Sequence, residues 1–187
     1  MPIAINGSGT VTGISVGGLP DGIVDTDMIA ANAVTLAKSA GRKVIQVVSS
    51  GIDNGEHMVS TSSLTYVTDS NLPNATITPI STSSDILIIA HIGMQNDNAD
   101  QIENTIFREQ SGLSDVDLSG SNTYGLSFQG ITGGSDYGGT HITLVDTSRP
   151  SGTSAITYKW YGRSEFGGDV KIRHKSSIGM TLLEFEP

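Results

Sequence analysis

The stretch Ile156-Thr157-Tyr158-Lys159-Trp160-Tyr161 decides the fold, because its side chains alternate strictly in size and polarity. Alternation with a period of two is the pattern of a β-strand with one buried face. Ile156, Tyr158 and Trp160 share that face, and they are among the largest apolar side chains of the chain. The stretch therefore predicts a strand that directs these three residues into a hydrophobic core.

A second stretch, Ile86-Leu87-Ile88-Ile89-Ala90, is apolar at every position. Continuous apolar runs of this length are typical of strands at the centre of a sheet with both faces covered. We expect this stretch to be a central strand.

The chain from Val44 onward repeats this organisation, with short apolar stretches separated by Gly, Asn, Asp and Ser. Strands are expected near 44–50, 64–69, 75–80, 85–94, 103–109, 125–131, 140–146, 154–161, 168–175 and 178–186. About ten strands in this length predict an all-β fold, an antiparallel β-sandwich or jelly roll.

The amino-acid composition excludes several classes of function. The 187 residues contain 23 Gly and no Cys, so thiol chemistry, disulfides and cysteine zinc sites are excluded. The net charge of −9 opposes nucleic acid as a partner, because binding of its phosphates requires an excess of Lys and Arg. No apolar run approaches the ~20 residues of a membrane-spanning helix, so membrane insertion is not expected.

Residues 1–43 do not share the strand pattern. They are rich in turn residues and hold too few apolar groups for a core of their own. A short helix is expected from Met28 to about Ser39, with Ile29, Ala33 and Leu36 on one side. That narrow stripe would be buried best in a bundle of three chains. We therefore divide the chain into an extended, partly helical attachment segment, 1–43, and a β domain, 44–187.

No catalytic constellation is visible, so an enzyme is not expected. There is no G-x-S-x-G elbow, and the four His have no marked nucleophile to serve. Asp115-Val116-Asp117-Leu118-Ser119-Gly120 copies the first half of a calcium loop, but Leu126 stands where a closing Glu would be needed. A weak calcium site at Asp115 and Asp117 and an Asx-type turn are both open, and no cofactor is predicted.

Two tyrosines are the candidate binding residues. Tyr124 and Tyr137 lie in the Gly-rich stretch 119–139, and exposed tyrosines on loops suit recognition of a glycan or protein surface. The alternative is that both rings pack inside the domain.

The order of several motifs resembles that of a domain found in fibre and other virion proteins of tailed bacteriophages. The motifs are Val44-Ile45-Gln46-Val47-Val48, Ser63-Leu64-Thr65-Tyr66-Val67, Thr76-Ile77-Thr78-Pro79, Ser81-Thr82-Ser83-Ser84-Asp85-Ile86-Leu87, Ile156-Thr157-Tyr158-Lys159-Trp160 and Met180-Thr181-Leu182-Leu183-Glu184. Residues 18–38 are similar to the N-terminal segments of marine-phage fibres.

This resemblance implies a homotrimeric virion protein. Its β domain would be a jelly-roll knob, similar to trimers of the tumour-necrosis-factor type, and residues 1–43 would bind other virion proteins of the capsid or tail. Fully extended, 43 residues span at most ~140 Å, which favours a short fibre.

Three functions follow as hypotheses. The first is a short trimeric fibre on the virion surface that adheres to a host glycan or protein. The second is a capsid decoration protein that staples head subunits. The third, which the residues favour least, is an enzyme that acts on polysaccharide.

Overall fold

The computed structural model describes residues 4–5, 11–12, 42–50, 58–96, 100–130, 136–174 and 178–186. The chain divides into two units, Met1–Gly41 and Arg42–Pro187. In the first unit, β1 (Ala4–Ile5) pairs antiparallel with β2 (Val11–Thr12). The expected helix with Ile29, Ala33 and Leu36 lies outside the described residues.

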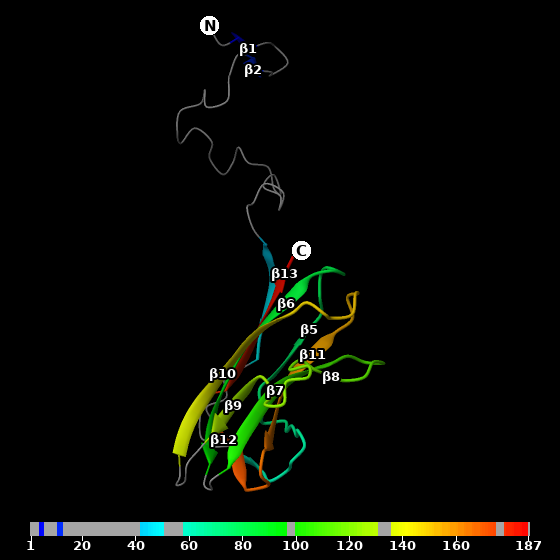
Figure 1. The fold of residues 1–187 in the computed structure, drawn as a ribbon. Coiled ribbons are helices and arrows are strands. Elements are labelled where there is room, and N and C mark those ends of the chain that lie inside the picture. The colour runs from blue at the N-terminus through cyan, green and yellow to red at the C-terminus, as the bar shows by residue number, and fades with distance from the viewer. Residues whose placement is uncertain are drawn as a thin grey trace. The chain divides into compact units, whose positions relative to one another are not determined.

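The second unit contains two antiparallel sheets (Figure 1). The first sheet is built from β3 (Val44–Ser49), β4 (Met58–Thr61), β6 (Asp85–Asn96), β10 (Asp136–Asp146), β12 (Val170–His174) and β13 (Gly179–Phe185). β6 is its central strand. One edge of β6 pairs with β10 along its whole length, and the other pairs first with β13 and then with β12. β3 continues the sheet beyond β13, and β4 beyond β12.

The second sheet is built from β5 (Asn74–Ile77), β7 (Gln101–Glu109), β8 (Val116–Asp117), β9 (Ser127–Gly130) and β11 (Ile156–Ser164). β11 lies between β5 and β7. The far edge of β7 pairs with β9 near Gln101 and with β8 near Arg108.

A single hydrophobic core is built from side chains of both sheets. The first sheet contributes alternate residues of β6, and the second contributes Ile156, Tyr158 and Trp160, all with no exposed surface. The all-β antiparallel fold is confirmed for the described residues, which contain no helix. The two curled sheets with one shared core are consistent with the predicted β-sandwich. No helix of the described residues is long and apolar enough to span a membrane.

Trp160 is the largest side chain that is fully buried in this core. Its ring is fully buried, and its Nε1 donates a hydrogen bond of 2.9 Å to Oδ1 of Asn104 on the neighbouring strand. A buried indole N–H without an acceptor is costly, so the pairing allows the largest side chain to be fully enclosed.

Two strand predictions are wrong. Residues 64–69 form no strand, and only Val67 bridges to Gly162. The Ser63 hydroxyl instead bonds the carbonyl and the backbone N–H of Thr65, which turns the chain locally. The expected central strand is confirmed as β6, but the expectation that both of its faces are covered is wrong. Ile89 is 41% exposed, because the described residues cover only one face of β6.

The second unit has two distinct ends. Its first and last described residues meet at one end, where the Glu186 N–H bonds the Lys43 carbonyl at 2.9 Å. Phe185 pairs with Asp85 there, so β6 runs away from this end for twelve residues, roughly 40 Å. We call the other end, near Asn96, Gln101 and Ser164, the distal end (Figure 1).

Candidate functional site

An apolar row crosses the outer face of the first sheet. Val47, Leu183, Leu87 and Val145 occupy directly paired positions on β3, β13, β6 and β10, and we call them the outer row. Val47 is 58% exposed and Val145 is 47% exposed, and the two leucines are partly buried. Ile89 extends the apolar surface beside the row. Four adjoining apolar side chains on a solvent face are characteristic of an interaction surface.

The positions beyond the outer row carry small side chains. Ser49, Thr181 and Thr143 stand beside Ile89, and Gly93 pairs with Gly139 further along the sheet. His91 and His141 lie between these two groups, so only part of this face carries small side chains.

A second group of exposed apolar residues lies at and near the distal end. Leu64 is 59% exposed, Tyr124 50%, Phe128 60% and Phe166 66%, and we call these four residues the distal cluster. The rings of Tyr124 and Phe128 lie 5.8 Å apart between centroids.

Arg163 holds the loops of the distal cluster together. It pairs with the buried Glu103 carboxylate at 2.5 Å, and its Nη2 donates to the Thr123 carbonyl at 2.8 Å. The guanidinium carbon also lies 4.7 Å from the centroid of the Tyr66 ring, a cation–π contact. Burial raises the pKa of Tyr66 to about 12, although the nearby charge of Arg163 opposes the shift.

A buried carboxylate fixes the loop that carries Phe166. Asp100 accepts hydrogen bonds from the Ser164 hydroxyl at 2.7 Å and from the N–H groups of Phe166 and Gly168 at 3.0 and 2.6 Å. Burial alone would raise the pKa of Asp100, but these hydrogen bonds outweigh it and hold the pKa below its usual value. Phe166 is therefore exposed on a loop with a fixed backbone.

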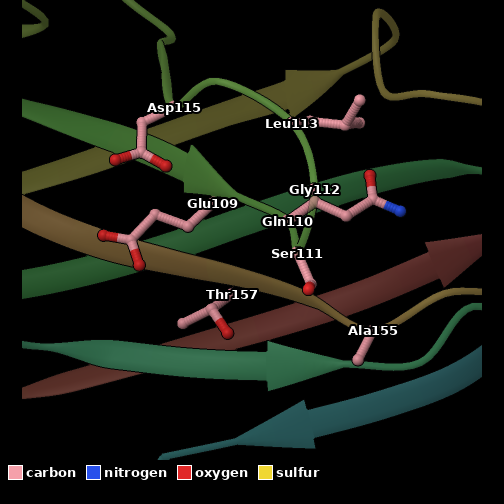
Figure 2. Close-up of a pocket in the computed structure, with 8 residues that line it drawn as sticks. All are labelled: Glu109, Gln110, Ser111, Gly112, Leu113, Asp115, Ala155 and Thr157. Atoms are coloured by element: carbon pink, nitrogen blue, oxygen red, sulfur yellow. The ribbon is translucent and has the colours of Figure 1, made fainter.

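An open pocket of about 450 Å³ lies at the Glu109 end of β7 (Figure 2). It is lined by Glu109, Gln110, Ser111, Gly112, Leu113, Asp115, Ala155 and Thr157. Figure 2 shows the carboxylates of Glu109 and Asp115 on the same side of the pocket. Glu109 already pairs with Lys159 at 2.6 Å and accepts a hydrogen bond from the Tyr161 hydroxyl at 3.1 Å. Because both contacts join β7 to the neighbouring strand β11, we assign Glu109 to the scaffold.

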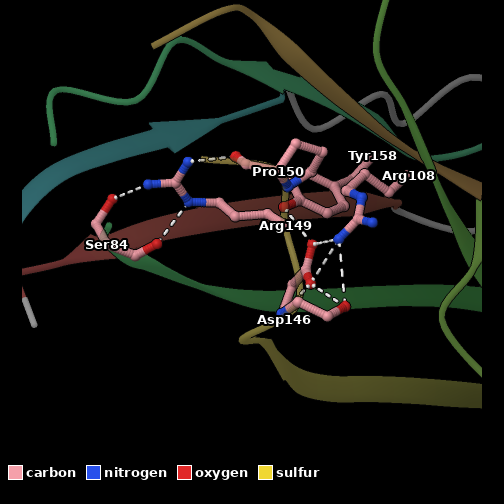
Figure 3. Close-up of polar contacts among 7 residues, drawn as sticks. Ser84, Arg108, Asp146, Arg149, Pro150 and Tyr158 are labelled. Atoms are coloured by element: carbon pink, nitrogen blue, oxygen red, sulfur yellow. Dashed lines mark hydrogen bonds and ion pairs between the residues drawn. The ribbon is translucent and has the colours of Figure 1, made fainter. Parts of the chain in front are cut away.

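A buried polar network lies near the end of the second unit where Lys43 and Glu186 meet (Figure 3). Arg149 donates to the carbonyl and the hydroxyl of Ser84, at 2.5 and 2.8 Å. The Ser84 hydroxyl in turn donates to the fully buried Glu184 at 2.5 Å. These bonds join the loop before β6 to the loop after β10, so we assign this network to the scaffold.

The structure places the predicted binding residues differently. Tyr124 is half exposed in the distal cluster, as a contact residue needs to be. Tyr137 lies in β10, where its backbone pairs with Gln95, and its side chain is not described.

The candidate calcium loop forms an Asx turn. Asp117 Oδ1 accepts from the Ser119 N–H at 2.9 Å and from the Thr105 hydroxyl at 2.5 Å, and Asp115 is exposed. In the described ranges no group of three or more acidic or histidine side chains converges on one point.

Leu64 and Phe166 were missed by the sequence reasoning. Phe166 precedes Gly167 and Gly168, and a large apolar residue beside a glycine pair is a signal for an exposed loop tip. Leu64 carried no such signal, because it was assigned to a strand.

The chain matches no protein-family model, and no curated protein matches it either.

Proposed function

We propose that this protein is a structural component of a tailed-phage virion, a short homotrimeric fibre. Residues 1–43 anchor it to other virion proteins, and the β domain forms a knob that adheres to a glycan or protein of the host surface.

The outer row carries this proposal. Only 36% of the residues are hydrophobic, yet Val47, Val145 and Ile89 are exposed to solvent together on one face of the sheet. Burial of these side chains would stabilise the protein. Three copies that pack around an axis bury such a face without any further partner.

The strand order supports a jelly-roll knob. The strands from β4 to β7, and again those from β9 to β12, alternate between the two sheets. Such alternation is a feature of jelly rolls and supports this part of the proposal. A knob of this kind is expected for trimers of the tumour-necrosis-factor type.

The distal cluster supports adhesion. Because Lys43 and Glu186 meet at one end of the β domain, the chain enters the domain at the end opposite the distal end. Tyr124, Phe128 and Phe166 would then meet the host surface. Three copies on each fibre, and many fibres on a particle, turn weak contacts into avid binding.

The location is tested by gold-labelled antibody against the purified chain, applied to intact phage particles that contain it. We expect label at the tail. Label spread over the head would favour the decoration protein instead, and absence of label from particles would contradict a virion role.

Adhesion is tested separately by competition. The purified chain added before phage is expected to slow adsorption to host cells, and the variant Phe166→Asp is expected to compete less well. The variant Leu113→Asp, which changes an apolar residue that is 53% exposed and lies outside the distal cluster, serves as the control. Equal competition by the two variants would remove the distal cluster from the contact.

A further inference from the structure

Two histidines lie side by side on the outer face of the first sheet. His91 of β6 and His141 of β10 are directly paired in the strand register. Their ring centroids are 5.8 Å apart and their planes are inclined by 29°. His141 is exposed and His91 is partly exposed, so both imidazoles are accessible from the same side of the sheet.

Three glycines border this pair on two sides. Gly179 pairs with His91 from the opposite strand, and Gly93 and Gly139 form the next outward-facing pair along the sheet. A Cβ at position 179 would lie 2.8 Å from the His91 ring, so a side chain there would displace the ring. Glycine inside strands often marks a place where a ligand or another backbone approaches closely.

The chemistry of the pair selects a ligand class. The next outward-facing pair in the other direction is Ile89 with Thr143, so no carboxylate occupies a position directly before or after the pair on these two strands. Calcium and magnesium require several oxygen ligands and are therefore poorly suited. Imidazole nitrogens suit Cu²⁺, Ni²⁺ and Zn²⁺, and adjacent imidazoles on one rigid ladder need little reorganisation to chelate one ion.

We propose that His91 and His141 together form a bidentate site for a divalent transition-metal ion, with water in the remaining coordination positions. The site requires only the pairing of β6 with β10. It lies on the same face as the outer row, one outward-facing position beyond Ile89, so the proposed trimer must leave this part of the face open for the ion to bind.

The test is calorimetric titration of the tag-free, full-length protein with CuCl₂, NiCl₂ and ZnCl₂. We expect one ion per chain, with Cu²⁺ bound most tightly, and no heat from MgCl₂ or CaCl₂. The variants His91→Ala and His141→Ala are each expected to weaken binding by about 100-fold, because the second ligand binds as an intramolecular step.

The matched control is His174→Ala, which removes a histidine of β12 outside the pair and is expected to leave the affinity unchanged. The electron paramagnetic resonance spectrum of the Cu²⁺ complex is expected to show two coordinated nitrogens, and one in either pair variant. Absence of binding by the wild-type protein would overturn the proposal, as would equal affinities of wild type and His141→Ala. His141 is exposed, so this variant keeps the test valid even if His91→Ala does not fold.

Discussion

Arg108 of β7 and Asp146 of β10 form a buried ion pair that joins the two sheets (Figure 3). The Arg108 Nη1 lies 2.9 Å and 2.8 Å from the two carboxylate oxygens of Asp146. The Tyr158 hydroxyl of β11 donates to the same carboxylate at 2.9 Å. The Asp146 side chain has no exposed surface, and its Oδ1 also accepts hydrogen bonds of 3.1 Å from the N–H and the hydroxyl of Ser148.

Removal of one partner is expected to destabilise the domain strongly. We predict that Asp146→Ala lowers the free energy of unfolding by about 3–5 kcal/mol, because Arg108 keeps a buried charge without its acceptor. The double variant Arg108→Met with Asp146→Leu is expected to recover much of this loss, since it removes both charges. Urea unfolding measures both. If the double variant is no more stable than Asp146→Ala, the loss does not come from the orphaned charge.

Glu184 is expected to make stability depend on pH in the acid range. Burial alone would raise its pKa, but hydrogen bonds from the Ser84 hydroxyl and the N–H groups of Ile80 and Ser81 hold the pKa below its usual value. A carboxyl with a lowered folded-state pKa stabilises the protein above its ordinary pKa. That stabilisation is lost as the pH falls through the folded-state value.

The variant Glu184→Gln tests this dependence. We predict that wild type is more stable than Glu184→Gln at neutral pH, and that the difference shrinks as the pH falls below about 4. Thermal unfolding at a series of pH values measures it, with Asp115→Asn as an exposed-carboxylate control. A difference that stays constant down to pH of about 2 would contradict the assignment.

Gly125 is expected to tolerate no side chain. Its φ is 67°, and a Cβ there would lie 2.5 Å from the Asn104 carbonyl oxygen and 2.6 Å from the Tyr66 hydroxyl. Gly112 has a φ of 82°, but a Cβ there would have no atom within 4 Å. Gly112→Ala therefore measures the cost of the backbone conformation alone. We predict a cost of about 1–2 kcal/mol for Gly112→Ala, and a clearly larger one for Gly125→Ala. Equal values in denaturant unfolding would show that the loop moves aside.

The distal cluster is expected to affect adhesion without affecting folding. We predict that Tyr124→Ala and Phe166→Ala each change the unfolding free energy by less than about 0.5 kcal/mol, because both side chains are at least half exposed. Binding of the labelled protein to host cells is expected to fall in both variants. Unchanged binding in both, with the fold intact, would place the receptor contact elsewhere.

The sequence was sufficient to predict which residues are buried in strands that have one solvent-exposed face and one buried face. The alternation in β11 predicted that Ile156, Tyr158 and Trp160 are buried, which is confirmed. On the opposite face of β11, Lys159 and Arg163 pair with Glu109 and Glu103 of β7.

Composition alone did not predict which strand faces are exposed or how far the strands extend. The apolar run in β6 does not reveal that Leu87 and Ile89 face outward. An apolar strand face has the same composition whether it is exposed or covered. Gly138 and Gly139 were assigned to a loop, although β10 extends through them to pair with Met94 and Gly93. Neither the outer row nor the His91–His141 pair could be predicted, since both depend on the register between distant strands.

The most direct test of the central claim is the molar mass of the purified full-length chain, measured by light scattering. The account predicts three times the chain mass of 19.5 kDa, and a shift toward one chain in the variant Val145→Asp, which puts a charge in the outer row. The Leu113→Asp variant is expected to keep the mass of the wild type. A wild-type protein with the mass of a single chain at every concentration would contradict the trimeric fibre.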